Sequence, residues 1–146
     1  MKFTLIIDPS KEEEVVATVH EYSTLTQQIE ALILQYTGTD RITAYADEEI
    51  KILLFEEIEC ITVFNGKTFA VDAKNKKYRL KQRLYELEQQ LPSYFIRINK
   101  STLANENRIE RYTATFSGSV DAVFRCGYRE YVSRRCFSAI KRRYQK

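Results

Sequence analysis

The sequence predicts a mainly β fold of the α+β class, in which one helix is inserted among antiparallel strands and a helix lies near each end. Two observations lead to this prediction. From residue 41 onward, apolar residues recur with a period of two through most of the chain, which is typical of strands that bury one face. Three other stretches repeat at intervals of three and four residues, which indicates amphipathic helices.

The first 38 residues predict an acidic extension of the order strand, strand, helix. Apolar side chains alternate over 2–8 and again over 14–20, so we expect a strand in each segment. A helix competes with the second strand, because the glutamates at 12–14 suit a first helical turn. After a hydroxyl cap at residue 23 or 24, apolar residues share one helical face: Leu25, Ile29, Leu32, Ile33 and Tyr36.

Residues 39–146 predict the main domain. The extension is too small to be stable alone, so we expect it to pack on this domain through the apolar face of its helix. Asn65-Gly66 is the strongest hairpin signal, and Ile58 and Cys60 should share one face of the strand before it. Helices are expected over 81–90 and from residue 134 onward. Strands are expected over 41–46, 50–55, 58–64, 67–72, 78–80, 94–98, 109–116, 120–126 and 128–132.

The charge of the chain is strongly asymmetric. Residues 1–64 hold 4 basic and 13 acidic residues, a net charge of −9, whereas residues 65–146 hold 19 basic and 7 acidic residues, a net charge of +12. An excess of positive charge attracts polyanions, and in a cell the polyanion most often met is nucleic acid. The alternative is a basic face that is merely solvated.

Several classes of function lack support in the sequence. His20 has no nearby nucleophile. The acidic runs at 12–14 and 56–59 are expected to be solvated faces, or sheet edges whose charge prevents pairing with another chain. The three cysteines are widely spaced, so we expect buried thiols at Cys60 and Cys136 in place of a disulfide or metal site. We therefore expect no enzyme activity, metal, cofactor or small-molecule substrate. A cytoplasmic location is expected, since no signal peptide or long apolar run is recognisable.

Two strand ends carry polar and basic side chains, which suit a surface that contacts phosphates and base edges. Arg97, Asn99, Lys100 and Ser101 surround the first strand end, and Arg134-Arg135 follow the second, just before the last helix. Lysine and arginine donate to guanine, and asparagine can pair with adenine. Alternatively, Asn99 and Ser101 form only a turn that caps a short helix over 102–107, and Arg97 supports that turn.

These segments resemble the LytTR family of bacterial DNA-binding domains. The resemblance covers roughly residues 42–146, and the order and spacing of its motifs together are specific. It implies an elongated fold of stacked antiparallel sheets without a helix-turn-helix. The matching residues are Phe95-Ile96-Arg97-Ile98-Asn99-Lys100-Ser101, Asn105 and Val132-Ser133-Arg134, preceded by the helical stretch from Leu84 to Pro92.

The resemblance implies that loops enter successive major grooves of double-stranded DNA. Lys100 fills a base-contacting position, Arg134 is the recurrent arginine, and Arg135 matches a base contact in the second groove. Lys67 matches a third contact on a neighbouring loop, where a solubilising role is the alternative. The family's usual sites are direct repeats, which implies two copies side by side, at least a homodimer on DNA. The acidic extension matches a subgroup without a receiver domain, for which the resemblance implies a small membrane protein as regulatory partner.

We therefore expect a transcriptional regulator that binds specific sequences of double-stranded DNA. A protein-interaction module, in which the acidic extension of one copy meets the basic face of another, is the second hypothesis. An RNA binder is the third, because aromatic side chains can stack on single-stranded bases; burial in the core is the alternative for them. These side chains are Tyr94, Phe95, Phe69, Phe116 and Phe124.

Overall fold

The computed structural model describes residues 1–144. The mainly β prediction is confirmed. Among these residues, no helix is long and apolar enough to cross a membrane. The helices are α1 (Thr24–Thr37), α2 (Leu84–Gln90) and α3 (Arg134–Tyr144), with short 3-10 turns η1 (Phe55–Glu57) and η2 (Glu106–Arg108). The strands are β1 (Arg41–Ala46), β2 (Glu49–Leu54), β3 (Ile58–Phe64), β4 (Lys67–Asp72), β5 (Lys77–Leu80), β6 (Phe95–Asn99), β7 (Thr102–Asn105), β8 (Ile109–Ala114), β9 (Val120–Phe124) and β10 (Arg129–Val132).

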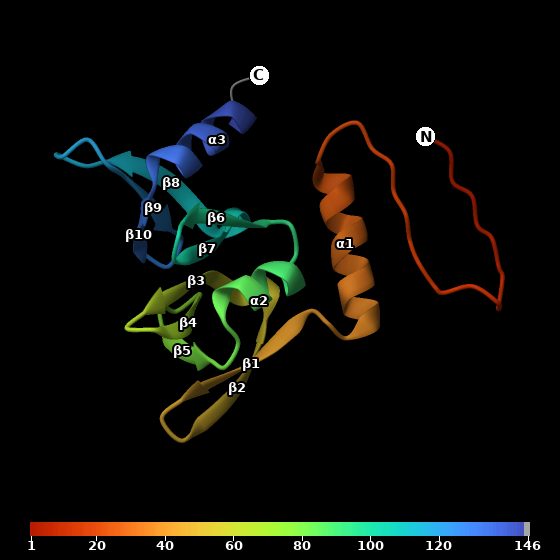
Figure 1. The fold of residues 1–146 in the computed structure, drawn as a ribbon, viewed down its shortest axis with the longest axis horizontal. Helices are drawn as coiled ribbons and strands as arrows, with labels where there is room; N and C mark the ends of the chain where they lie inside the picture. Colours follow the sequence, from red (N-terminus) through yellow and green to blue (C-terminus); the bar gives the residue numbers. More distant parts are fainter. Residues whose placement is uncertain (145–146) are drawn as a thin grey trace.

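The strands pair antiparallel in two sheets. The larger sheet has the order β2-β1-β5-β4-β3-β7-β6, and the smaller sheet has the order β10-β9-β8. Figure 1 shows the smaller sheet with α3 at one end of the body (residues 39–144) and the β1–β2 hairpin at the other end. Strand β7 was not predicted. Its four residues are all buried, and they form a strand where the alternative prediction was a short helix.

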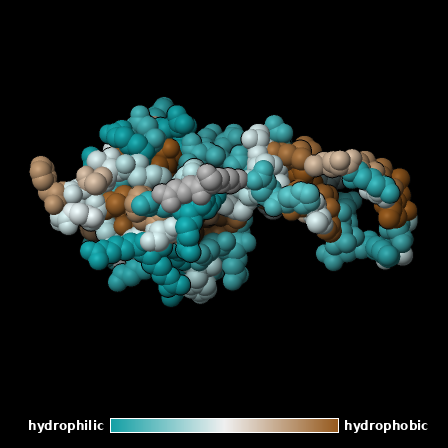
Figure 2. Space-filling model, turned by 90° about the horizontal axis from the view of Figure 1, so that it is seen from above, coloured by the Kyte–Doolittle hydropathy of each residue, from teal (hydrophilic) through white to brown (hydrophobic). Residues whose placement is uncertain are grey.

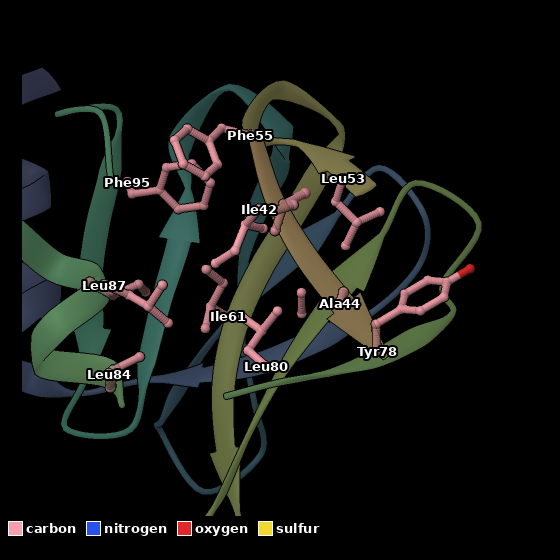
Figure 3. Close-up of a cluster of buried hydrophobic side chains, with 13 residues drawn as sticks. Ile42, Ala44, Leu53, Phe55, Ile61, Tyr78, Leu80, Leu84, Leu87 and Phe95 are labelled. Atoms are coloured by element: carbon pink, nitrogen blue, oxygen red, sulfur yellow. The ribbon is translucent and has the colours of Figure 1, made fainter. Parts of the chain in front are cut away.

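The first hydrophobic core lies between the larger sheet and α2. Leu84 and Leu87 are one turn apart on α2 and both are buried against strand residues, as Figure 3 shows. The rings of Phe55 and Phe95 close this core edge to face, with centroids 6.5 Å apart. Burying one leucine contributes about 1.5–3 kcal/mol. This packing holds α2 in place, because a helix of seven residues is not stable by itself.

The second core joins the two sheets and positions the strand ends that carry the basic residues. Ile98 of β6 is fully buried in it, so the polar residues that follow Ile98 start from a fixed point. The same core holds the underside of α3 through Ile140. Its members are Cys60, Val71, Ile98, Ala104, Ala122, Phe124, Val132 and Ile140.

Strand β3 departs from the predicted alternation. Ile58 packs in the first core and Cys60 in the second, because the pairing of β3 with β4 shifts register between these residues, as in a β-bulge. The bulge turns Glu59 inward, so this carboxylate is fully buried and is not the solvated edge that was predicted. It accepts a hydrogen bond from Nε of Arg108 at 2.6 Å and another from the backbone N–H of Cys126 at 3.3 Å.

The Asn65-Gly66 hairpin is confirmed. Asn65 has φ 52° and Gly66 has φ 73°, and Phe64 pairs directly with Lys67 across the turn. Positive φ at both central residues is the geometry of the tight hairpin turn that this dipeptide favours.

The extension (residues 1–38) differs most from the prediction. α1 forms, but residues 1–23 contain no strand, and every residue of 1–22, here called the arm, is exposed. The predicted packing of α1 through Leu32 is also wrong, since no α1 residue is buried and Leu32 is 64% exposed. The physical reason is that a lone pair of strands is at best marginally stable, and the body supplies no third strand.

The three cysteines differ in burial, which predicts their reactivity. Cys60 is fully buried, whereas Cys126 and Cys136 are half-buried, so the expectation for Cys136 is met only in part. Burial raises the pKa of the Cys60 thiol well above its usual range, and only the thiolate is a good nucleophile. We expect iodoacetamide at mildly alkaline pH to label Cys136 in the native protein but to label Cys60 only after unfolding, as mass spectrometry would measure. Equal labelling of Cys60 and Cys136 in the native protein would contradict this expectation.

Candidate nucleic-acid interface

The turn between β6 and β7 presents one lysine and hides the residue before it. Asn99 is buried; its Oδ1 accepts a hydrogen bond from the N–H of Ser101 at 2.8 Å, and its Nδ2 donates to the carbonyl of Tyr131 at 2.7 Å. Both ends of the Asn99 amide are thus used inside the protein. Lys100, in contrast, is exposed at the tip of the turn. The arrangement favours the turn-forming role of Asn99 over contact with a base.

The start of α3 is held beside this turn. The N–H of Ser133 donates to the carbonyl of Ile98 at 2.8 Å, and Oγ of Ser133 accepts from the N–H of Cys136 at 3.2 Å, as a helix cap does. Arg134 and Arg135 follow as the first residues of the helix. Both are exposed, and neither makes a side-chain hydrogen bond or ion pair within residues 1–144.

The two predicted strand ends are therefore one surface. The hydrogen bonds from Asn99 to Tyr131 and from Ser133 to Ile98 join β6 to β10 and to the first turn of α3. A groove of about 1300 Å³ lies along this junction, and Lys100 and Arg135 both line it. We use the name basic surface for this groove together with four exposed cations. These cations are Lys67, Lys100, Arg134 and Arg135.

Lys67 lies at the same end of the body. The N–H of Val63 donates to the carbonyl of Ser101 at 2.9 Å, which ties the β3–β4 hairpin to the β6–β7 turn. Lys67 begins β4 on the far side of that hairpin, where it is exposed. It too has no hydrogen bond or ion pair among the residues that the structure describes.

Arg97 supports the turn, which is one of the two roles considered for it. Its Nη1 donates to the carbonyl of Lys100 at 2.7 Å, and its Nη2 donates to Oε2 of Glu88 on α2 at 2.6 Å. The side chain is 30% exposed. Arg97 therefore connects the tip of the turn to α2.

The groove is electropositive. Lys77, Arg97, Lys100 and Arg135 line it, against a single carboxylate, that of Glu130. Glu130 accepts a hydrogen bond from the hydroxyl of Tyr128 at 2.7 Å. Burial raises the pKa of Tyr128, and the bond to Glu130 raises it further, so the phenol stays neutral and keeps donating. Because Glu88 pairs with Arg97, Glu130 is the one carboxylate that faces Lys77, Lys100 and Arg135, so positive charge remains in excess in the groove.

Sequence reasoning missed two contributors to this surface. Lys77 reaches the groove from β5, and only folding brings this strand beside a turn that lies more than twenty residues later. Ser133 had a usable signal, because a serine directly before a helical stretch is a preferred cap.

Comparison with known proteins identifies the family. Residues 48–145 match the family of LytTr DNA-binding domains. The chain belongs to this family. A solved LytTr DNA-binding domain from Bacillus cereus has the same fold, with a TM-score of 0.65 at 20% identity over 73% of this chain and 98% of that chain.

Curated relatives of this LytTr protein match it over nearly the whole length. A protein of Staphylococcus aureus strain MSSA476, named as an HTH-type transcriptional regulator, is 33% identical over 98% of this chain and 97% of its own. A protein of the same name in strain MW2 shows the same identity and coverage. The extension therefore lies within the region that these relatives share with the chain.

The helix-turn-helix in those names has no counterpart within residues 1–144. α1 leads into β1, α2 lies between β5 and β6, and α3 follows β10, so no two helices are consecutive. Loops and a helix start, rather than a recognition helix, form the basic surface of this LytTr domain.

Proposed function

We propose that this LytTr protein is a transcriptional regulator that reads specific sequences of double-stranded DNA, with its loops in successive major grooves. One observation supports this most directly: two hydrogen bonds, Asn99 to Tyr131 and Ser133 to Ile98, bring the exposed cations of two distant segments onto one surface. Membership of a DNA-binding family and the regulator names of the relatives support the same function.

In this proposal Lys100 and Arg135 contact base edges. Both side chains project from tips that are otherwise held rigid, and both can donate to O6 and N7 of guanine. Arg134 contacts a phosphate at the start of α3, because a helix N-terminus offers free N–H groups and favours an anion. Two arginines at that position are unfavourable for the helix without an external anion.

The remaining predicted residues either neutralise phosphate charge on the DNA or hold Lys100 in position. Lys67 and the hydroxyl of Ser101 contact backbone phosphates, which set orientation without reading sequence. Asn99 and Arg97 hold the tip of the turn so that Lys100 enters the groove at a fixed angle. A turn whose backbone is already ordered loses less conformational entropy on binding.

Two copies bind side by side on direct repeats. One copy offers two base-reading side chains, and a good contact contributes only about 1–3 kcal/mol of discrimination. A second copy on an adjacent repeat doubles the number of such contacts, which a regulator needs in order to find its site among competing DNA.

Binding to duplex DNA should depend steeply on salt. If the basic surface neutralises about six phosphates, the logarithm of affinity should fall with the logarithm of salt concentration at a slope near −5. Fluorescence anisotropy with a labelled duplex, titrated at several salt concentrations, measures this slope. The duplex should carry DNA from upstream of the protein's own gene.

Single-stranded RNA of the same length is the control. The proposal requires that duplex DNA bind more tightly at equal salt. A slope near zero, or tighter binding to the RNA, would show that the basic surface does not serve duplex DNA.

A further inference from the structure

The arm presents an unusual amount of exposed apolar surface. Phe3, Leu5 and Ile7 are 72–86% exposed, and Val15 and Val16 are more than half exposed. Figure 2 shows brown, apolar residues gathered on the extension, apart from the mainly teal body. Solvent-exposed apolar residues in this density mark a contact surface.

α1 turns its polar side to the body. Glu30 accepts hydrogen bonds from the N–H and the hydroxyl of Ser93, both at 2.6 Å. Thr24, Gln27, Gln28 and Ala31 line the cleft between α1 and the body. With 3.6 residues per turn, the stripe of Leu25, Leu32 and Tyr36 lies on the other side of the helix. These three side chains are 39–76% exposed.

We propose that the extension is a dimerisation unit that pairs with the extension of a second copy of this chain, so that the two arms complete one sheet and the two α1 helices cover it. The inference goes beyond the proposed function and does not depend on DNA binding.

The backbone of the arm leaves two apolar segments available for pairing. Residues 3–7 and 15–19 belong to no helix or strand within one copy (Figure 1), and a turn lies between them in which the N–H of Lys11 donates to the carbonyl of Asp8 at 3.2 Å. Two such strands are marginal alone, but four strands with helices on one face form a stable layer. A second copy adds two more strands and a second α1 helix, which completes the four-stranded layer.

The charge pattern allows two identical segments to pair. Residues 3–7 and 15–19 contain no charged side chain, whereas Lys2, Asp8 and the glutamates at 12–14 lie at the ends of these segments or in the turn. Two copies can therefore pair these segments without placing like charges opposite each other, which would be destabilising. A two-fold axis makes such a contact self-complementary.

The area available matches that of a stable dimer. The exposed apolar side chains of the extension are Phe3, Leu5, Ile6, Ile7, Val15, Val16, Val19, Leu25, Leu32 and Tyr36. Ile6 and Val16 alternate onto the face that the helices leave open, so about eight of these side chains, at about 60–120 Å² each from a transfer value of about 1.5–3 kcal/mol and about 25 cal/mol per Å², would bury on the order of 500–1000 Å² per copy, a range that includes a standard specific interface.

The body does not need the extension for its fold. The solved LytTr domain corresponds to 73% of this chain while using 98% of its own length, and hydrogen bonds between Glu30 and Ser93 join α1 to the body. Direct repeats relate two bodies by translation, whereas a dimer of extensions has a two-fold axis. The link at Gly38, with φ 73°, must then let the bodies turn relative to the dimer.

Sedimentation equilibrium of the full chain tests the proposal. The wild-type protein should have twice the mass of one 17.2 kDa chain. Leu5→Glu/Ile7→Glu should raise the dimer dissociation constant at least about a hundredfold without changing the melting temperature of the body. Amide exchange in residues 3–7 and 15–19 should be slow in the wild-type dimer and fast in this variant.

Tyr85→Glu/Phe116→Glu is the matched control, because it places two glutamates on exposed apolar positions of the body. This variant should remain dimeric. A wild-type protein that is monomeric at all concentrations would overturn the proposal and leave the apolar surface to another partner. A dimer that survives the Leu5→Glu/Ile7→Glu change, or that shows no slow exchange in the arm, would overturn the pairing proposed here.

Discussion

Replacing Arg108 with methionine should lower the free energy of unfolding by about 3–5 kcal/mol. The guanidinium of Arg108 lies 2.6 Å from Glu59, whose side chain is fully buried. Methionine keeps most of the volume of arginine but leaves the carboxylate buried without a cation. Urea unfolding at neutral pH, followed by circular dichroism, measures the change.

The double variant Glu59→Gln/Arg108→Met separates the charge effect from packing. Glutamine keeps an oxygen that can accept from the N–H of Cys126 but carries no charge, so much of the lost stability should return. Arg111→Met is the control, since Arg111 pairs with Glu110 on the surface with both side chains more than half exposed, and such pairs contribute little. If Arg111→Met cost as much as Arg108→Met, burial of Glu59 would not be the cause.

Lys100→Ala and Arg135→Ala should each weaken binding to the preferred duplex by about 1–3 kcal/mol, and weaken binding to random duplex less. Both side chains are exposed, lie on tips that hydrogen bonds hold in place, and line the same groove. Loss of a base contact affects only the sequence that offers that base, whereas loss of a phosphate contact affects every sequence. Anisotropy titrations on both duplexes at one salt concentration measure the difference.

Arg142→Ala is the control for this pair. Arg142 lies two turns beyond Arg135 on α3, is exposed, and donates only to the carbonyl of Ser138. Its removal should weaken both duplexes alike or do little. Arg143 does not serve as a second control, because it pairs with Glu106 at 2.9 Å. Equal losses on both duplexes for Lys100, Arg135 and Arg142 would contradict base reading.

Local signals predicted most of the body. The Asn65-Gly66 hairpin, the strands from residue 41 onward and the two helices of the body all follow from spacing and turn residues that act over a few positions. The same reasoning went wrong at β3, because a bulge at Glu59 depends on pairing with β4 and leaves no mark in the sequence. It missed β7 because a strand of four residues gives too short a pattern to separate from a turn.

In the candidate site, the sequence placed Lys100, Arg134 and Arg135 at strand or helix ends, and the structure has them exposed there. It did not predict that the amide of Asn99 would be used by Tyr131, which is thirty-two positions away. It also did not predict that Arg97 would be bound to other residues of the protein, whereas the side chains of Lys100, Arg134 and Arg135 have no internal partner among residues 1–144. Those distinctions depend on which atoms meet after folding.

The sequence by itself determined the identity of the strands and the body helices, the asymmetry of charge and the position of the basic residues at strand ends, because each depends on residues close together in the chain. The tertiary structure decided which polar groups are used internally, where the two basic ends meet, and that the apolar side chains of residues 3–7 stay exposed within one copy. These outcomes depend on contacts between distant segments, whose burial and hydrogen bonding exist only once the sheets have packed.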